Sequence, residues 1–323
     1  MRSILNRHSM VVLTALLIGA LGLSACGTDD EDPATDTRTG ADVVTVEHQF
    51  GTTEVEPAPE RIVTLDVQWT DVMLAMGVEP VGYAVDPNMP ESGVPWQDLP
   101  ASAEALNMAD GVPVEQIAEL QPDLIAGTYS ITDEAVYDQL AQIAPTIATL
   151  DAAQVEPWQD LVHTAGEVLA DPEAADELVA SVDEQVAAVA DDLPGLRNKT
   201  FALAQYVVGD AIYIVADEAD GSSVFFQQLG MTMYPPVRDH GEKTGQTRIN
   251  VSTERSDLLR ADFLAFLING GDEADLADIA GFEQLPGTVA VLDYATIVGL
   301  NTPSPLSIPY ALEQLLPYLE QAA

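Results

Sequence analysis

The stretch from residue 172 to residue 193, PEAADELVASVDEQVAAVADDL, predicts one long helix near the middle of the chain. Asp171 is a favourable N-cap, and Pro172 suits the first helical position. Apolar residues then recur along one face at a period of 3.6: Leu178, Val179, Val182, Val186, Val189, Ala190 and Leu193. Pro194 and Gly195 end the pattern, and at 1.5 Å per residue the helix is about 33 Å long. We interpret it as a rod between two halves of the chain.

Both halves carry the pattern of an α/β protein. Strand-like apolar runs alternate with helical patterns and Gly or Pro turns, which is typical of βαβ units and a parallel sheet. The strands that we predict span residues 61–66, 80–83, 124–127, 145–150, 200–208, 211–215 and 288–292, with a hairpin over 43–55. Residues 86–107 and 234–247 read as loops, and residues 304–319 as a closing helix. The predicted fold class is therefore α/β, with two Rossmann-like lobes joined by a single long helix.

Composition narrows the functions that this chain can have. Its 323 residues suit two domains, and 47% hydrophobic residues in periodic runs indicate a folded protein. Lys and Arg total 11 against 53 Asp and Glu, which gives a formal net charge of −42. Nucleic acid is a poor partner for such a chain, because neutralising phosphates requires clustered basic residues.

The N-terminus resembles a bacterial lipoprotein signal. Two arginines precede an apolar run, residues 10–21, that is too short for a stable transmembrane helix. LSACG, residues 23–27, is similar to a lipobox, and Cys26 is the only cysteine. We expect a signal peptide over 1–25, lipidation of Cys26 and a polar tether over 26–42, which would hold the protein outside the cytoplasmic membrane. The alternative is a secretory signal followed by an unrelated thiol.

One short motif occurs on both sides of the rod. Glu115 precedes Asp123 by eight residues, and Glu254 precedes Asp262 by the same spacing. Each pair reads as a helix with an early glutamate, a turn, an aspartate and an apolar strand. The recurrence favours two similar lobes without proving a duplication.

Several segments together resemble a known family. They are PERIV (59–63), LAMGVEPVG (74–82), LQPDLI (120–125), YDQLAQIAPT (137–146) and the ending from Leu292 to Leu315. In this order, behind a lipobox and around a central helix, they are similar to the substrate-binding lipoproteins of ABC importers for ferric siderophores and vitamin B12, over about residues 43 to 320. The ending resembles the siderophore members more.

The resemblance implies an organisation and a function. It implies an N-terminal lobe over 43–157, a connecting helical segment over 158–194 and a C-terminal lobe over 195–323, with the ligand held in the cleft between the lobes. The protein would capture a ferric siderophore and deliver it to an ABC permease dimer with its ATPase. It would be a binding protein rather than an enzyme, a monomer, and free of any cofactor or direct metal ligand.

The resemblance also implies one docking glutamate in each lobe, which would pair with permease arginines. Glu115 and Glu254 are the matching positions. Charged contacts of this kind fix the register of a complex and speed its formation. The alternative is that both are ordinary first-turn glutamates, which stabilise a helix through its dipole.

A ferric siderophore needs aromatic walls and a few cations or hydrogen-bond donors. Because basic residues are scarce, the candidate cations are Arg238 and Arg248, with Lys243 between them. The alternative for each is a surface pair with an acidic neighbour. Candidate aromatic residues at strand ends are Trp69, Tyr83, Tyr129 and Tyr206, each of which could instead be core packing. Asn301 and Thr302 are further candidate donors.

Other ligands and another class of protein remain as alternatives. A zinc or manganese binder would need converging His and carboxylate ligands, whereas His48, His163 and His240 fall in unrelated elements. Haem, with His240 or a tyrosine as axial ligand, and vitamin B12 stay open. A siderophore-processing hydrolase is the enzyme alternative, but no GxSxG, P-loop, HExxH or GxGxxG motif is present. Ser222 and Ser223 read as a helix start.

Overall fold

The computed structural model describes residues 43–85, 93–150 and 155–323. The predicted signal peptide, Cys26 and the predicted tether lie outside the described residues. Within the described part of the chain, no helix is long and apolar enough to cross a membrane.

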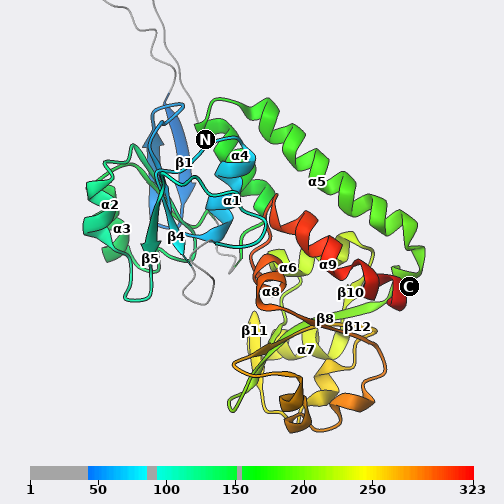
Figure 1. Cartoon of the computed structure of the whole chain (residues 1–323). Helices are drawn as coiled ribbons and strands as arrows, with labels where there is room; N and C mark the ends of the chain where they lie inside the picture. The colour runs from blue at the N-terminus through cyan, green and yellow to red at the C-terminus, as the bar shows by residue number, and fades with distance from the viewer. Residues whose placement is uncertain (1–42, 86–92, 151–154) are drawn as a thin grey trace, which may run out of the picture. The chain divides into compact units, whose positions relative to one another are not determined.

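The first sheet forms the N-terminal lobe, and its described strands are all parallel (Figure 1). Their order is β5-β4-β3-β6-β7, so that the chain leaves the central strand β3 first on one side and later on the other. The strands are β3 (Ile62–Thr64), β4 (Gly82–Val85), β5 (Glu104–Asn107), β6 (Leu124–Ala126) and β7 (Thr146–Ile147). The helices between them are α1 (Val67–Ala75), α2 (Val114–Glu119) and α3 (Glu134–Ala141). The point where this order reverses is where open α/β sheets place ligands.

A hairpin of β1 (Val44–His48) and β2 (Gly51–Val55) precedes this sheet, as the sequence predicts. Val46 and Val55 alternate with exposed residues and join the hydrophobic core. The hairpin therefore packs on the lobe through one face only.

The second sheet forms the C-terminal lobe and is mixed, with the order β11-β9-β8-β12-β13 and β10 beside β8. Strands β8, β12 and β13 are parallel, whereas β9 runs antiparallel to both of its neighbours, β8 and β11. Strand β9 is reversed because it forms a hairpin with β8. The strands are β8 (Thr200–Val207), β9 (Ile212–Val215), β10 (Thr232–Met233), β11 (Arg248–Val251), β12 (Phe263–Asn269) and β13 (Thr288–Leu292). The helices are α6 (Gly221–Gln228), α7 (Pro235–Thr244), α8 (Tyr294–Asn301) and α9 (Ser307–Ala322). Short 3₁₀ turns cover Pro194–Leu196, Ser256–Leu259, Glu273–Asp278 and Phe282–Gln284.

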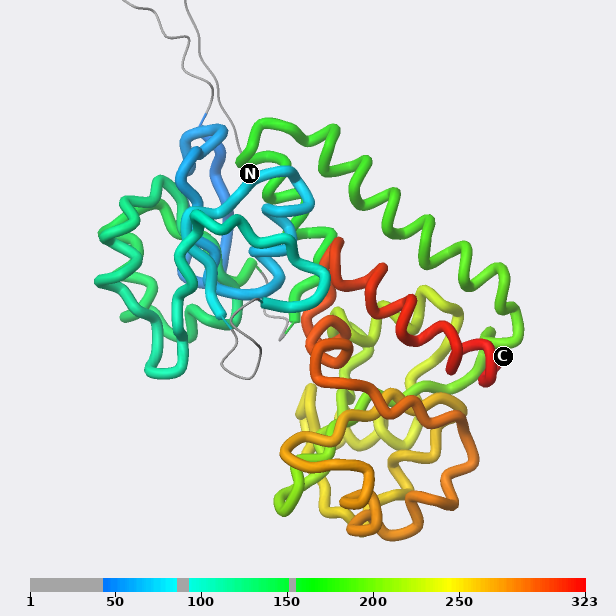
Figure 2. The backbone as a smooth tube through the Cα atoms, in the orientation of Figure 1, coloured from blue at the N-terminus to red at the C-terminus, as the bar shows by residue number. Residues whose placement is uncertain are grey.

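The predicted rod is α5 (Pro172–Asp192), and it is a separate helix from α4 (Trp158–Val168). The Asp171 side chain accepts a hydrogen bond from the Ala174 amide at 3.2 Å, so that a new N-cap starts the helix. Val182 and Val186 are buried, and the rest of the predicted stripe packs against the core. Helix α5 contacts α4 and α9, and residue 323 lies against Gly195, just past the rod (Figure 2).

The repeated aspartate has the same structural role in both lobes. Asp123 accepts hydrogen bonds from the backbone N–H groups of Glu60 and Arg61, both at 2.8 Å, just before β3. Asp262 accepts from the backbone N–H and the hydroxyl of Thr200 at the start of β8, also at 2.8 Å. Each aspartate thus ties the start of a strand to the neighbouring parallel strand, which extends the recurrence from sequence to geometry.

Four local predictions differ from the structure. Residues 235–244 form α7 instead of a loop, because two prolines at its first positions need no N–H partner and Gly245, at φ 69°, ends the helix. The predicted closing helix, residues 304–319, is α9, but a further helix that was not predicted, α8, precedes it, and β5 lies in the predicted loop 86–107. Glu254 precedes a 3₁₀ turn rather than lying in a helix.

Candidate functional site

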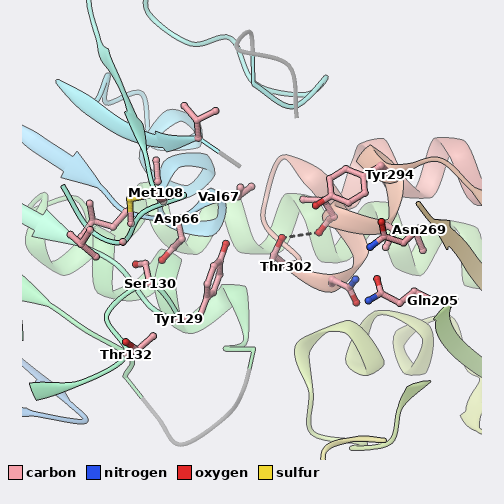
Figure 3. A pocket seen from close by; sticks show the side chains of 18 of the residues that line it. Asp66, Val67, Met108, Tyr129, Ser130, Thr132, Gln205, Asn269, Tyr294 and Thr302 are labelled. Carbon is pink, nitrogen blue, oxygen red and sulfur yellow. Dashed lines mark hydrogen bonds between the residues drawn. The ribbon is translucent and has the colours of Figure 1, made fainter. Parts of the chain in front are cut away.

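A pocket of about 660 Å³ lies where the two sheets supply residues from the ends of their strands. Its volume is within the range usual for small-molecule sites. Residues of the N-terminal lobe form one side and residues of the C-terminal lobe the other (Figure 3). The polar lining residues are Asp66, Tyr129, Ser130, Thr132, Gln205, Asn269, Tyr294, Asn301 and Thr302.

On the N-terminal side, Asp66 connects the ends of β3 and β6. It follows β3 and caps α1, where one carboxylate oxygen accepts from the Trp69 amide at 2.9 Å. Its other oxygen accepts from the Thr128 amide at 2.5 Å and from the Thr128 hydroxyl at 3.0 Å. Burial raises the pKa of the Asp66 carboxyl, while the N–H groups of Trp69 and Thr128 lower it. These bonds fix the loops at the point where the strand order reverses.

The loop after β6 brings Tyr129 and Ser130 to the pocket. It begins at Gly127, where a Cβ atom would lie 2.7 Å from the Ser130 hydroxyl and 3.0 Å from the Leu65 side chain. Only glycine therefore allows this tight course of the chain. Tyr129 is 45% exposed, high for an aromatic residue in this structure, and it lines the pocket.

On the C-terminal side, two amides stand at the ends of neighbouring strands. Gln205 lies on β8 and is paired in register with Leu267 of β12. Asn269 is two residues beyond Leu267, and both line the pocket, as the alternation of a strand requires. Figure 3 shows Gln205, Asn269 and Tyr294 on this side of the pocket.

Helix α8 supplies a third set of lining residues. Tyr294, Ile297, Val298 and Asn301 follow one another at helical spacing and share the face that lines the pocket. The Asp293 side chain caps the helix by accepting from the Thr296 amide at 2.8 Å. Thr302 ends α8, and its hydroxyl donates to the Val298 carbonyl oxygen at 2.7 Å.

The chemistry of this lining suits binding. It combines apolar walls, such as Val67, Met108 and Leu267, with neutral hydroxyl and amide groups. Within the described residues, no group of three or more His, Cys, Asp or Glu side chains is placed to hold a metal ion. His48 lies in the hairpin, His163 on α4 and His240 on α7.

A family model described as periplasmic binding protein matches residues 62–257, more than half of the chain. The chain belongs to the periplasmic binding protein family. Members of this family are binding proteins of transport systems and do not catalyse a reaction, which agrees with the expected class of protein.

The relatives of this periplasmic binding protein confirm the resemblance seen in the sequence. It is 30% identical over 224 residues to the probable siderophore-binding lipoprotein YfiY of Bacillus subtilis, an alignment that covers 68% of this chain and 66% of the relative. It is 24% identical to the iron(3+)-hydroxamate-binding protein FhuD of the same species, with 88% of each chain covered.

Solved structures confirm the α/β fold with two lobes. The crystal structure of a periplasmic solute binding protein from Mycobacterium smegmatis is 27% identical, covers 87% of this chain and 98% of that chain, and gives a TM-score of 0.71. Streptococcus pneumoniae PiaA in complex with ferrichrome gives a TM-score of 0.72 at 22% identity, with 86% and 98% covered, and shows the fold alone.

The structure separates the aromatic candidates of this periplasmic binding protein. Tyr129 lines the pocket, whereas Trp69 is fully buried in the core and Tyr206 is buried, with its hydroxyl donating to Asp278 at 3.2 Å. Tyr83 is buried on β4. The residues of β4 that line the pocket are Ala84 and Val85, which follow it. The three buried residues thus belong to the hydrophobic core and do not line the pocket, which agrees with the packing alternative.

The candidate cations also lie outside the pocket lining. Arg238 is on the surface of α7 and pairs with Asp239 at 2.8 Å. Arg248, on β11, lines a smaller cavity of about 100 Å³ that shares Gln205 and Asn301 with the pocket. Lys243 is in the last turn of α7. Of the polar candidates, Asn301 and Thr302 are in the lining.

Sequence reasoning missed Asp66, Gln205, Asn269 and Tyr294. A signal was present for two of them, because Gln205 lies within, and Asn269 at the end of, segments that are otherwise apolar, FALAQYV and FLAFLIN. Both amides are half-buried, and a polar group in an apolar strand needs a partner or a ligand.

Proposed function

We propose that this protein captures a ferric siderophore outside the cytoplasmic membrane and delivers it to an ABC permease. The observation that carries the proposal is the pocket, with its neutral donors, exposed aromatic ring and apolar walls. Iron in such a chelate is already surrounded by oxygen atoms of the ligand. The protein then needs shape and hydrogen bonds, which this lining offers, rather than a set of metal ligands.

The relatives support the same proposal. YfiY is described as a probable siderophore-binding lipoprotein, FhuD as an iron(3+)-hydroxamate-binding protein and a further Bacillus subtilis relative, YfmC, as an iron(3+)-citrate-binding protein. Different iron chelates occur among them, so that relatedness alone does not choose the chelate.

Three further residues would serve the delivery of the chelate to the permease. Cys26 would carry the lipid that anchors the protein to the membrane. Glu115, in the first turn of α2, and Glu254, before a 3₁₀ turn of the other lobe, are both exposed and can meet permease arginines.

Titration of the purified protein with ferric siderophores tests the proposal, with binding followed by tryptophan fluorescence and by calorimetry. Iron-free siderophores, haem and cobalamin are the comparison ligands. We expect submicromolar binding of at least one ferric chelate and much weaker binding of its iron-free form. Binding of haem or cobalamin alone would refute the proposal, as would turnover of the chelate.

Two substitutions in the pocket locate the site. Gln205→Ala removes a hydrogen-bonding group and Tyr129→Ala an aromatic wall, and each should weaken binding about tenfold. Arg238→Ala is the control, because Arg238 is exposed and outside the lining. A loss of affinity in the control but not in the pocket variants would place the site elsewhere.

A further inference from the structure

In the described part of the chain, the pocket lacks the basic residues that were expected to bind a negatively charged ferric siderophore. Among the residues that the structure describes, no arginine or lysine lines it. The donors that it offers are the amides of Gln205, Asn269 and Asn301, together with hydroxyl groups. Among the described lining residues, Asp66 is the acidic side chain, so that the lining offers an anionic chelate no positive charge.

Arg248 is the basic side chain next to this pocket, and its charge is already compensated. Its guanidinium donates to the Asp220 carboxylate at 3.2 Å, and the Asp220 side chain is 1% exposed. The other oxygen of Asp220 accepts from the amide and hydroxyl of Ser222, which holds the carboxylate in place. A buried aspartate fixed in this way keeps Arg248 directed toward itself.

Asn301 lies between Arg248 and the pocket. Its side-chain oxygen accepts from the Arg248 guanidinium at 3.4 Å, and Asn301 lines both cavities. With its oxygen engaged, its NH₂ group is the part left to serve a ligand. Arg248 therefore orients the neutral Asn301 amide at the pocket and does not present a free cation to a ligand.

The charge of an iron(III) chelate depends on its ligating groups. Three hydroxamates supply one negative charge each and give a neutral complex, whereas three catecholates supply two each and give a trianion. Moving an anion out of water into a site without a compensating cation is unfavourable. Neutral amide and hydroxyl donors, by contrast, match the carbonyl and N–O oxygens of a neutral hydroxamate chelate.

We propose that this pocket selects iron(III) chelates without net negative charge, of the tris-hydroxamate type, and rejects tris-catecholate and citrate-type chelates. The proposal rests on the proposed function. It adds the charge class of the ligand, which follows from the described amide lining without a basic residue and from the Arg248–Asp220 pair.

A competition between two chelates tests the proposal. Ferrichrome is a neutral tris-hydroxamate and ferric enterobactin is a trianionic tris-catecholate, and calorimetry gives the dissociation constant of each. We expect ferrichrome to bind at least tenfold more tightly. Equal or tighter binding of ferric enterobactin would overturn the charge proposal and leave the proposed function standing. If neither chelate nor any other ferric siderophore binds, the proposed function fails and the charge proposal falls with it.

A matched pair of variants separates charge from shape. Asn269→Lys puts a cation into the lining, and Asn269→Met adds a side chain of similar length without charge. We expect the lysine variant to shift the ratio of the two affinities about tenfold toward ferric enterobactin, which is about 1.4 kcal/mol. The methionine variant should leave the ratio unchanged. Equal ratios in both variants would overturn the proposal, with circular dichroism showing that both are folded.

Discussion

Asp71 carries a pH dependence of stability that one substitution can remove. It lies on α1 and is fully buried. One carboxylate oxygen accepts from the Trp96 indole N–H at 2.8 Å and from the Ser304 hydroxyl, and the other accepts from the Gln97 amide at 2.5 Å. Burial raises the pKa of Asp71 from 3.8 to about 7, although the hydroxyl, amide and indole donors act in the opposite direction.

The sign of the effect follows from this shift. Because the pKa of Asp71 is higher in the folded protein than in the unfolded chain, the folded state retains a proton that the unfolded chain loses. The stabilisation is fully present below pH 3.8 and is lost as pH rises through about 7. For these two pKa values, the free energy of unfolding falls by about 2.5 kcal/mol between about pH 5 and pH 8.

Asp71→Asn imitates the protonated carboxyl at every pH. The asparagine oxygen can accept from Trp96 and Ser304, and its NH₂ group can donate to Gln97 once that side-chain amide turns. We expect the difference in unfolding free energy between wild type and variant to change by about 2.5 kcal/mol from about pH 5 to pH 8, in favour of the variant at high pH. Urea unfolding followed by far-UV circular dichroism measures this difference, because other titrating groups cancel. Asp133→Asn, at an exposed N-cap of α3, is the control. A difference that stays constant across this pH range would refute the reasoning.

Three further predictions concern other parts of the molecule. Asp262→Asn should destabilise the protein at neutral pH, and the difference from wild type should vanish in urea unfolding as pH falls below the ordinary aspartate value, because the Thr200 N–H lowers the pKa of Asp262 in the folded state. Gly166→Ala should cost about 1–3 kcal/mol in the same assay, because the new Cβ would lie 2.5 Å from a side-chain atom of α5. Glu115→Ala combined with Glu254→Ala should abolish iron uptake by cells while calorimetry shows unchanged ligand affinity; lost affinity would contradict a docking role.

The framework of the fold could be predicted because local signals and tertiary packing agree. The period of α5, its Asp171 cap and its Pro194 stop each act within a few residues, and the packed structure satisfies all of them. Helix α8 was missed because YATIVGLN is apolar on nearly every side, so that it has no polar face to reveal its period. Helix α7 was missed because two prolines read as loop residues although they stand where a helix tolerates them.

The pocket was harder to predict, because membership depends on which way a side chain points after folding. Trp69 and Tyr129 both follow buried strands, yet Trp69 enters the core from a helix whereas Tyr129 leaves the strand in a loop. Whether the residue after a strand lies in a helix or in a loop thus decides whether its side chain enters the core or the pocket. No short-range sequence pattern predicts this direction. Tyr129 and Asn301 were predicted, whereas Gln205 and Asn269 were not, because only the packed sheet decides which face of a strand meets the pocket.

The acidity of the chain and the absence of basic residues from the described pocket lining act on different steps of binding. A net charge of −42 repels an anionic chelate during approach, but surface charges are screened within about 8 Å at physiological salt. Surface repulsion therefore slows association and weakens as salt is added. The lack of a lining cation acts on the bound chelate, where water and salt are largely displaced, so that it persists at any ionic strength. The proposed selection against anionic chelates therefore resides in the residues around Asn269 and Asn301, because the acidic surface alone cannot supply it.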